Sequence, residues 1–239
     1  MKSLAAAFSF LTIAGRGQRP DSSAAAWFGV VGAVLGLALG AVWEGASEIW
    51  GFVVVAAIVL VADVVLTGAL HIDGLADTGD GLLPHADRER RLEIMRTPDV
   101  GAFGVAVVGC VLLLRFAALL SISVDLWTFV APWAVARIAA GAAMRLVPYA
   151  RPDGLAATFV DDAGPRVRIT DVVLVAGAFV LAGAVDGAVG VGAVLVALSS
   201  FAALLALAIR RLGGFTGDVL GAGIVVAETA ALLALAGTW

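Results

Sequence analysis

The chain has 239 residues, of which 62% are apolar and 14% are charged, and its mean hydropathy is +1.04. One water-soluble core of this length cannot bury so much apolar surface, whereas a bilayer accepts it in stretches of about 20 residues, so a single soluble domain is excluded. The net charge of −4 also excludes a general basic field for nucleic acid.

Residues 3–15 form a mildly apolar segment that is too short to cross a bilayer. Arg16 and Arg19 follow it, where a cleaved signal peptide would carry small residues. We therefore expect an interfacial entry segment that stays with the mature protein.

Longer apolar stretches follow along the rest of the chain. Lipid offers no partner to unpaired backbone amides, and the stretches lack the alternation of a barrel strand, so each must be helical. We expect an all-α transmembrane bundle of about seven spans, with residues 1–239 forming one integral membrane domain. The predicted spans lie at 24–43, 50–70, 100–120, 127–147, 171–185, 191–209 and 218–238.

Two features inside the spans predict packing. Glycines recur every three or four residues from Gly29 to Gly40, which indicates close contact of the first span with a neighbouring helix. Cys110 is the single cysteine and lies in an apolar run. It cannot form an intramolecular disulfide, and we expect it to behave as a small buried hydrophobe.

The distribution of basic residues predicts the orientation, because short cytoplasmic loops carry the excess of Lys and Arg. Thirteen of the 15 basic residues fall in alternate loops or beside them, and the intervening loops carry only acidic charges. The amino terminus and the loops near 71–99, 148–170 and 210–218 are therefore predicted to be cytoplasmic.

An acidic stretch follows the second predicted span. Asp73, Asp77 and Asp80 are spaced four and three residues apart, so on a helix they share one face and repel one another unless a cation lies between them. Mg²⁺ suits such oxygen ligands and completes its shell with water and substrate phosphates. Nearby glycines would leave room for a ligand. A solvated acidic helix end is the alternative.

Residues 87–96 resemble a short amphipathic cytoplasmic helix. Arginines opposite a metal–carboxylate cluster would neutralise a diphosphate substrate. Arg96, directly before a Thr-Pro helix stop, is the best candidate for this role. For Arg88, Arg90 and Arg91, membrane orientation alone is the simpler explanation.

Four ionisable residues fall inside predicted spans, where an unpaired charge costs several kcal/mol. They could act in catalysis or transport, or they could pair with one another as structural elements. They are Asp63, Arg115, Arg137 and Glu228.

A glycine-rich loop, residues 211–218, leads into the last span. Free backbone amides at such a helix start can bind an anion or help to hold a second metal. Alternatively, Thr216 or Asp218 simply caps the helix.

Taken in order, these motifs resemble the cobalamin 5′-phosphate synthase family, and the resemblance covers most of the chain. The acidic stretch and the glycine-rich loop are its most specific parts. The motifs are HIDGLADTGDG at 71–81, LEIMR at 92–96, VGAFG at 100–104, PYAR at 148–151 and LGGFTGD at 212–218.

The resemblance implies the last assembly step of the corrin nucleotide loop, in the cytoplasmic (inner) membrane of a prokaryote. Adenosylcobinamide-GDP would be joined to α-ribazole or its 5′-phosphate, which yields adenosylcobalamin or its 5′-phosphate and releases GMP. The partners would be these substrates and the lipid bilayer, without nucleic acid, and a homo-oligomer is left open.

Site roles follow from combining the motifs with the chemistry. We expect Asp73, Asp77 and Asp80 to hold Mg²⁺, and Asp80 or His71 to accept the hydroxyl proton. The residues expected to bind substrate are Arg96, Arg137, Arg151, Thr216 and Asp218.

Two other functions are weighed against this one. A CDP-alcohol phosphotransferase would place Ala-Arg between its first and later aspartates, where this chain has Leu75-Ala76-Asp77. An ion-coupled transporter would concentrate its polar groups near the bilayer midplane. Here the densest polar cluster is predicted at the cytoplasmic surface, which favours the enzyme.

Overall fold

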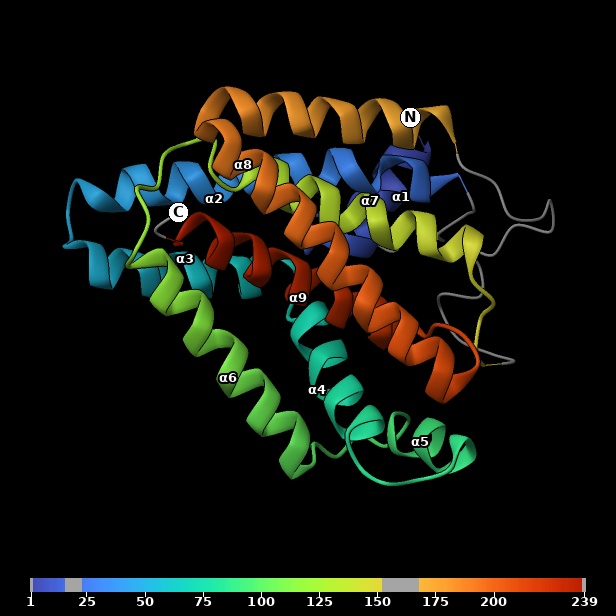
Figure 1. Cartoon of the computed structure of the whole chain (residues 1–239). Helices are drawn as coiled ribbons and strands as arrows, with labels where there is room; N and C mark the ends of the chain where they lie inside the picture. The colour runs from blue at the N-terminus through green and yellow to red at the C-terminus, as the bar shows by residue number, and fades with distance from the viewer. Residues whose placement is uncertain (1, 16–22, 152–167, 238–239) are drawn as a thin grey trace.

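The computed structural model describes residues 2–15, 23–151 and 168–237, and within these ranges it is helical without a β-strand. Figure 1 shows the helices arranged as one bundle. The helices are α1 (Lys2–Leu11), the 3-10 turn η1 (Ala24–Trp27), α2 (Phe28–Ser47), α3 (Phe52–Leu66), α4 (Leu70–Leu82), α5 (Arg88–Ile94), α6 (Ala102–Leu119), α7 (Val130–Leu146), α8 (Ile169–Leu212) and α9 (Gly217–Leu235).

The predicted all-α membrane bundle is confirmed. Four helical segments in the described ranges are long and apolar enough to cross a bilayer, and the bent pair α3 and α4 would make a fifth. The four are 24–47, α6, α8 and α9. The larger number of about seven spans stays a prediction, as does the side on which the amino terminus lies.

The second predicted span, 50–70, is not one straight helix. α3 ends at Leu66, and α4 leaves it at an angle of 88°. Gly68 and Ala69 at the corner both have positive φ, 59° and 60°. Glycine adopts this conformation freely, whereas an alanine does so only under strain. The bend puts the acidic stretch on a short helix of its own.

The fifth and sixth predicted stretches lie in the two arms of α8. Gly187 has φ 60° and ψ −139° and interrupts the helix, and Figure 1 shows the chain turning back there. A Cβ atom on Gly190 would lie 2.3 Å from the carbonyl oxygen of Ala182. The arms therefore meet backbone to backbone beside the turn.

The glycine ladder of α2 packs on α7 and the segment before it. Cβ atoms on Gly32, Gly36 and Gly40 would lie 2.2–2.6 Å from carbonyl oxygens of residues 126–133. Only glycine allows this approach, as at other membrane helix interfaces. The predicted close packing of the first span is thus confirmed.

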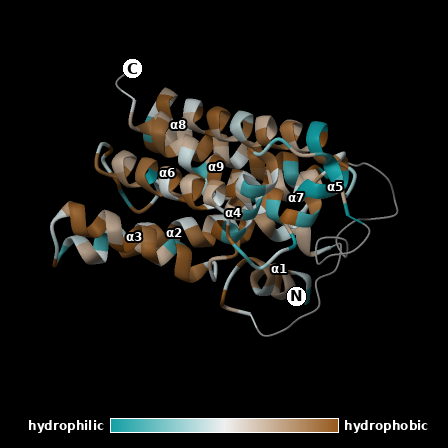
Figure 2. Cartoon of the chain, turned by 90° about the horizontal axis from the view of Figure 1, so that it is seen from below, coloured by the Kyte–Doolittle hydropathy of each residue, from teal (hydrophilic) through white to brown (hydrophobic). Residues whose placement is uncertain are grey.

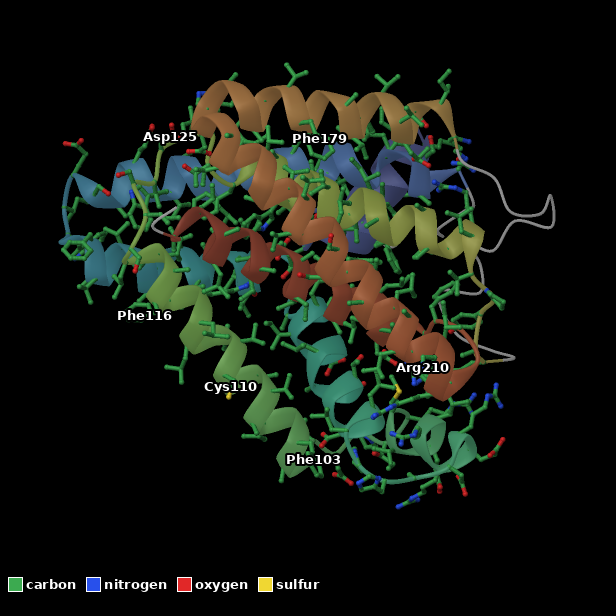
Figure 3. All side chains as sticks on the ribbon, viewed as in Figure 1. Phe103, Cys110, Phe116, Asp125, Phe179 and Arg210 are labelled. Atoms are coloured by element: carbon green, nitrogen blue, oxygen red, sulfur yellow. The ribbon has the colours of Figure 1, made fainter. Side chains whose placement is uncertain are left out.

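The bundle helices are predominantly apolar in Figure 2, while α5 is strongly hydrophilic. Val61, Leu113 and Val180 are between 62% and 73% exposed. Cys110 is also exposed and points away from the bundle on α6 in Figure 3. The expectation that it is buried was wrong, because Cys110 lies on α6 away from the helices that α6 contacts, which are α3, α4 and α9.

Two labelled residues of opposite charge lie at opposite ends of the bundle. Figure 3 places Asp125 at one end, and Arg210 at the other, where α5 also lies. This arrangement fits the alternation of loop charges in the sequence.

Candidate active site

The site is built where α4 lies against the start of α9. A Cβ atom on Gly74 would lie 2.8 Å from the carbonyl oxygen of Asp218, and one on Gly221 would lie 3.4 Å from the Cα atom of His71. Glycine at position 74 therefore lets the two backbones touch.

The other glycines of the acidic stretch also serve helix packing. A Cβ on Gly79 would meet Gly104 of α6 at 3.3 Å, and one on Gly81 would meet the side chain of Met95 at 2.4 Å. The expectation that these glycines leave room for a ligand was wrong, because protein atoms already fill that space.

Asp73, Asp77 and Asp218 form the acidic part of the site. Asp73 is exposed and Asp77 is half-buried, one turn later on the same face of α4. The negative charges that act most strongly on Asp77 are those of Asp218 and Asp73, and Arg151 opposes them. The structure thus adds a residue of α9 to two of the predicted aspartates.

Asp80 differs from the other two aspartates of α4. It is 7% exposed, and its two oxygens accept hydrogen bonds from the backbone N–H groups of Gly101 (2.6 Å) and Gly104 (2.9 Å). A carboxylate at a helix start accepts hydrogen bonds from N–H groups that lack a partner in the helix, and its negative charge interacts favourably with the helix dipole. The structure therefore gives Asp80 a role in holding α6, in place of an open ligand position.

Arg151 is brought to the acidic cluster by pairing between two loops. The backbone N–H of Ala150 donates to the carbonyl of Phe215 (2.8 Å), and that of Phe215 donates to the carbonyl of Pro148 (3.0 Å). Arg88 also links these loops, donating to the carbonyls of Leu212 (2.7 Å) and Ala150 (3.0 Å). The sequence explained Arg88 by membrane orientation, and its clamping role was missed because nothing local indicates its distant partners.

The Arg151 guanidinium donates from Nη2 to Asp218 Oδ2 at 2.9 Å and to the carbonyl of Met95 at 3.2 Å. Its Nε is buried and has no partner among the described residues. The side chain thus neutralises part of the acidic cluster.

Thr216 and Arg96 were predicted to contact substrate. Thr216 is fully buried and caps α9, because its hydroxyl accepts from the backbone N–H of Val219 at 3.2 Å. This is the capping alternative raised for the loop. Arg96 is exposed just after α5.

Two further arginines stabilise the far end of α4. Arg91 donates to the carbonyls of Gly81 (2.8 Å) and Leu82 (2.7 Å), and Arg211 also donates to the Leu82 carbonyl. Cations suit a helix carboxyl end, where carbonyls lack partners. Burial lowers the pKa of Arg91, and the nearby charge of Arg211 lowers this pKa further.

A cavity of about 230 Å³ opens beside the acidic cluster. His71, Asp73, Arg151 and Asp218 line it on the side of α4 and α9. The lining residues contributed by α1, α2 and α7 are all apolar. Carboxylates, a guanidinium and an imidazole beside an apolar cavity can bind a ligand that is part phosphate and part hydrophobic.

Comparison with known proteins decides the family. The model of the family described as "Cobalamin-5-phosphate synthase" matches residues 3–236. The chain belongs to the cobalamin-5-phosphate synthase family. It is therefore an enzyme of a transferase family in cobalamin biosynthesis.

Individual relatives match this chain over most of their length. The chain is 41% identical over 213 residues to an adenosylcobinamide-GDP ribazoletransferase of Bradyrhizobium diazoefficiens, covering 87% of this chain and 80% of the relative. It is 36% identical over 241 residues to a protein of the same name from Chlorobaculum tepidum, covering 96% and 91%. No solved structure matches the chain.

The buried charges of this synthase family member form a network across four helices. Arg115 of α6 pairs with Asp63 of α3 at 2.7 Å and with Glu228 of α9, and Arg137 of α7 pairs with Glu228 at 2.6 Å. Trp133 Nε1 donates to Asp63 at 3.1 Å. Two carboxylates and two guanidinium groups thus pair with one another, which is the structural alternative raised for these four residues.

Arg137 was predicted to bind substrate, and the structure places it away from the cavity lining. It is 0% exposed, and besides Glu228 it bonds the carbonyl of Trp133 at 3.1 Å. Its Nε and Nη2 atoms lack partners in the described part of the chain.

The acidic cluster offers carboxylate oxygens, which are the ligands that Mg²⁺ prefers. Among the described residues, no three His, Cys, Asp or Glu side chains come close enough to form a metal cage by themselves. Mg²⁺ does not need one, because it commonly takes one or two carboxylates and fills its shell with water and phosphate oxygens. Asp73 and Asp77 share a face of α4 and fit that requirement, and Arg151 is a cation that acts on Asp77.

Proposed function

We propose that this chain transfers the cobinamide phosphate of adenosylcobinamide-GDP to α-ribazole or its 5′-phosphate. A ribose hydroxyl oxygen of the acceptor bonds to the phosphorus that carries cobinamide, and the bond from that phosphorus to the oxygen of GMP breaks. The products are adenosylcobalamin, or its 5′-phosphate, and GMP. The hydroxyl proton passes to a base on the protein.

The observation that carries this proposal is the convergence of Asp73, Asp77, Asp218 and Arg151 beside a cavity that also has an apolar side. Phosphoryl transfer depends on positioning and on neutralising charge around the transferred group. Arg151 lines the cavity, and its guanidinium would bind a phosphate oxygen there. The names of the relatives support this choice of substrates.

Mg²⁺ is part of the proposal. Asp73 and Asp77 would hold the ion, which supplies positive charge to the diphosphate when bound. Asp218 lies across from them and holds Arg151 in place.

His71 is the better of the two expected bases. A base must offer a lone pair that no other donor already occupies. Asp80 already accepts two backbone hydrogen bonds at α6, whereas His71 lines the cavity and its buried Nε2 has no partner among the described residues.

We place the enzyme in the cytoplasmic membrane of a prokaryote, with the site facing the cytoplasm. The basic loops support this orientation by the positive-inside rule, and water-soluble nucleotides reach the site from that side. The apolar exterior of the bundle supports a lipid environment.

The test uses purified protein in lipid, supplied with adenosylcobinamide-GDP, α-ribazole 5′-phosphate and Mg²⁺, with product mass and GMP release as readouts. We expect product that disappears with EDTA and in Asp77→Asn. Glu93→Gln is the matched control, because this exposed carboxylate pairs with Arg90 on the surface of α5, away from the cavity lining.

Folded protein that makes no cobalamin phosphate would overturn the proposal. CDP-diacylglycerol with an alcohol acceptor would then be tested in the same vesicles for lipid transfer. Product formation that resists EDTA would overturn the role of Mg²⁺ alone.

A further inference from the structure

The apolar half of the cavity has no assigned occupant. Its wall comes from three helices that carry none of the acidic cluster: Phe10 and Leu11 of α1, Phe28 of α2, and Ala140 and Met144 of α7. The opposite half holds the carboxylates and Arg151. A ligand that fills the cavity therefore has an apolar end toward α1, α2 and α7 and a polar end toward α4 and α9.

The wall is partly aromatic and is held in place. The rings of Phe10 and Phe28 stack with centroids 5.8 Å apart and planes 10° apart. The backbone N–H of Ile13 donates to the carbonyl of Leu66 at 3.0 Å, which fixes the end of α1 at the corner between α3 and α4. Stacked rings and a polarisable methionine suit a flat aromatic ligand.

The size of the cavity selects among the ring systems of the proposed substrates. An apolar cavity of about 150 Å³ holds one benzene ring, so about 230 Å³ accommodates a two-ring base. A corrin macrocycle is far too large. Guanine has the right size, but its several donors and acceptors would lack partners against side chains such as Phe28 and Met144. A benzimidazole has few polar atoms, so against this wall at most one ring nitrogen would lack a hydrogen-bond partner.

We propose that this cavity binds the benzimidazole base of the ribazole acceptor, with its ribose directed toward Asp73 and Arg151. The inference rests on the proposed function and adds an acceptor subsite to it. It also gives α1 a role, because Phe10 and Leu11 become part of the surface that selects the base.

The experiment changes the size of the cavity and the size of the base together. Ala140→Val adds volume to the wall, and Ala139→Val is the matched control, since residue 139 is adjacent on α7 and does not line the cavity. Each variant is assayed in lipid with the 5′-phosphates of α-ribazole and of its analogue with unmethylated benzimidazole, and KM is measured separately for each acceptor and for adenosylcobinamide-GDP.

We expect Ala140→Val to lower kcat/KM for α-ribazole 5′-phosphate by about tenfold or more relative to its analogue with the smaller, unmethylated base. A methyl-sized change in an apolar pocket has an effect of this size. The KM for adenosylcobinamide-GDP should stay unchanged, and Ala139→Val should behave as the unmodified protein. Met144→Ala shortens a side chain of the same wall and so enlarges the cavity. This variant should shift the preference between acceptors in the opposite direction, toward bulkier bases.

Two results would overturn the subsite while leaving the proposed function intact. One is an active Ala140→Val variant whose preference between the two acceptors is unchanged. The other is an effect confined to the KM for adenosylcobinamide-GDP, which would assign the cavity to guanine. If the unmodified protein forms no cobalamin phosphate from either acceptor, it is the proposed function that fails.

Discussion

Arg151 Nη2 lies 2.9 Å from Asp218 Oδ2, although 67 residues separate them in the chain. The contact joins the loop after α7 to the first turn of α9, at the point where α4 presents its aspartates. Because the loop is held there by backbone pairing with Phe215, the guanidinium position depends on tertiary structure and not on local sequence.

Replacing Arg151 should therefore reduce turnover more than stability. We expect Arg151→Ala to lower kcat/KM by about 100-fold, the usual loss when one donor to a developing charge is removed. Arg151→Lys should recover only part of it, since an ammonium group cannot reproduce the fork of a guanidinium. Steady-state kinetics checks this, with Arg90→Ala on the exposed face of α5 as the control. Equal activity in Arg151→Ala and Arg90→Ala would refute the assignment.

Asp77 and Asp80 should respond differently to the same chemical change. Asp77→Asn is expected to abolish turnover with little change in thermal unfolding. Asp80→Asn should lower the free energy of unfolding by about 1–3 kcal/mol. Each carboxylate oxygen of Asp80 accepts a hydrogen bond from a backbone N–H, and in the variant an amide NH₂ group would face one of these donors. Unfolding in detergent and the activity assay together separate the two roles. A stable, inactive Asp80→Asn would return that residue to the catalytic cluster.

Gly74 tests the contact between α4 and α9. In Gly74→Ala the new Cβ would lie 2.8 Å from the carbonyl oxygen of Asp218, so the two helices must separate. We expect kcat to fall by roughly 100-fold, since displacing reacting groups by about 1 Å has that effect. Gly45→Ala is the control, because among the described residues nothing beyond its own stretch of helix lies within 4 Å of its Cβ position. Full activity in Gly74→Ala would show that the spacing of these helices is not critical.

The buried network should matter for stability. Glu228→Gln leaves Arg115 and Arg137 without their shared carboxylate. Breaking such a pair typically costs about 3–5 kcal/mol, whereas Glu93→Gln at the surface should cost at most about 1 kcal/mol. Thermal unfolding of both variants in the same detergent measures the difference. Equal unfolding temperatures would show that the network does not stabilise the bundle.

Much of the fold could be read from the sequence. The apolar stretches, the glycine ladder of α2 and the motif order depend on composition and on spacing along one helix, so they indicated a helical membrane protein of this family. The bend at Gly68 and Ala69 could not be read in the same way, because the apolar pattern continues through it while positive φ angles break the helix.

The candidate site, too, could be predicted from the sequence only in part. Sequence by itself determined that Asp73 and Asp77 share a face, because helical periodicity is a local property. Only the tertiary structure decided that Asp218 joins them while Asp80 holds α6, and that Arg137 pairs with Glu228 while Arg151 reaches the cluster. The physical reason is that a charged group takes the partner that helix packing brings within hydrogen-bond distance, and here those partners lie 21 to 91 residues away.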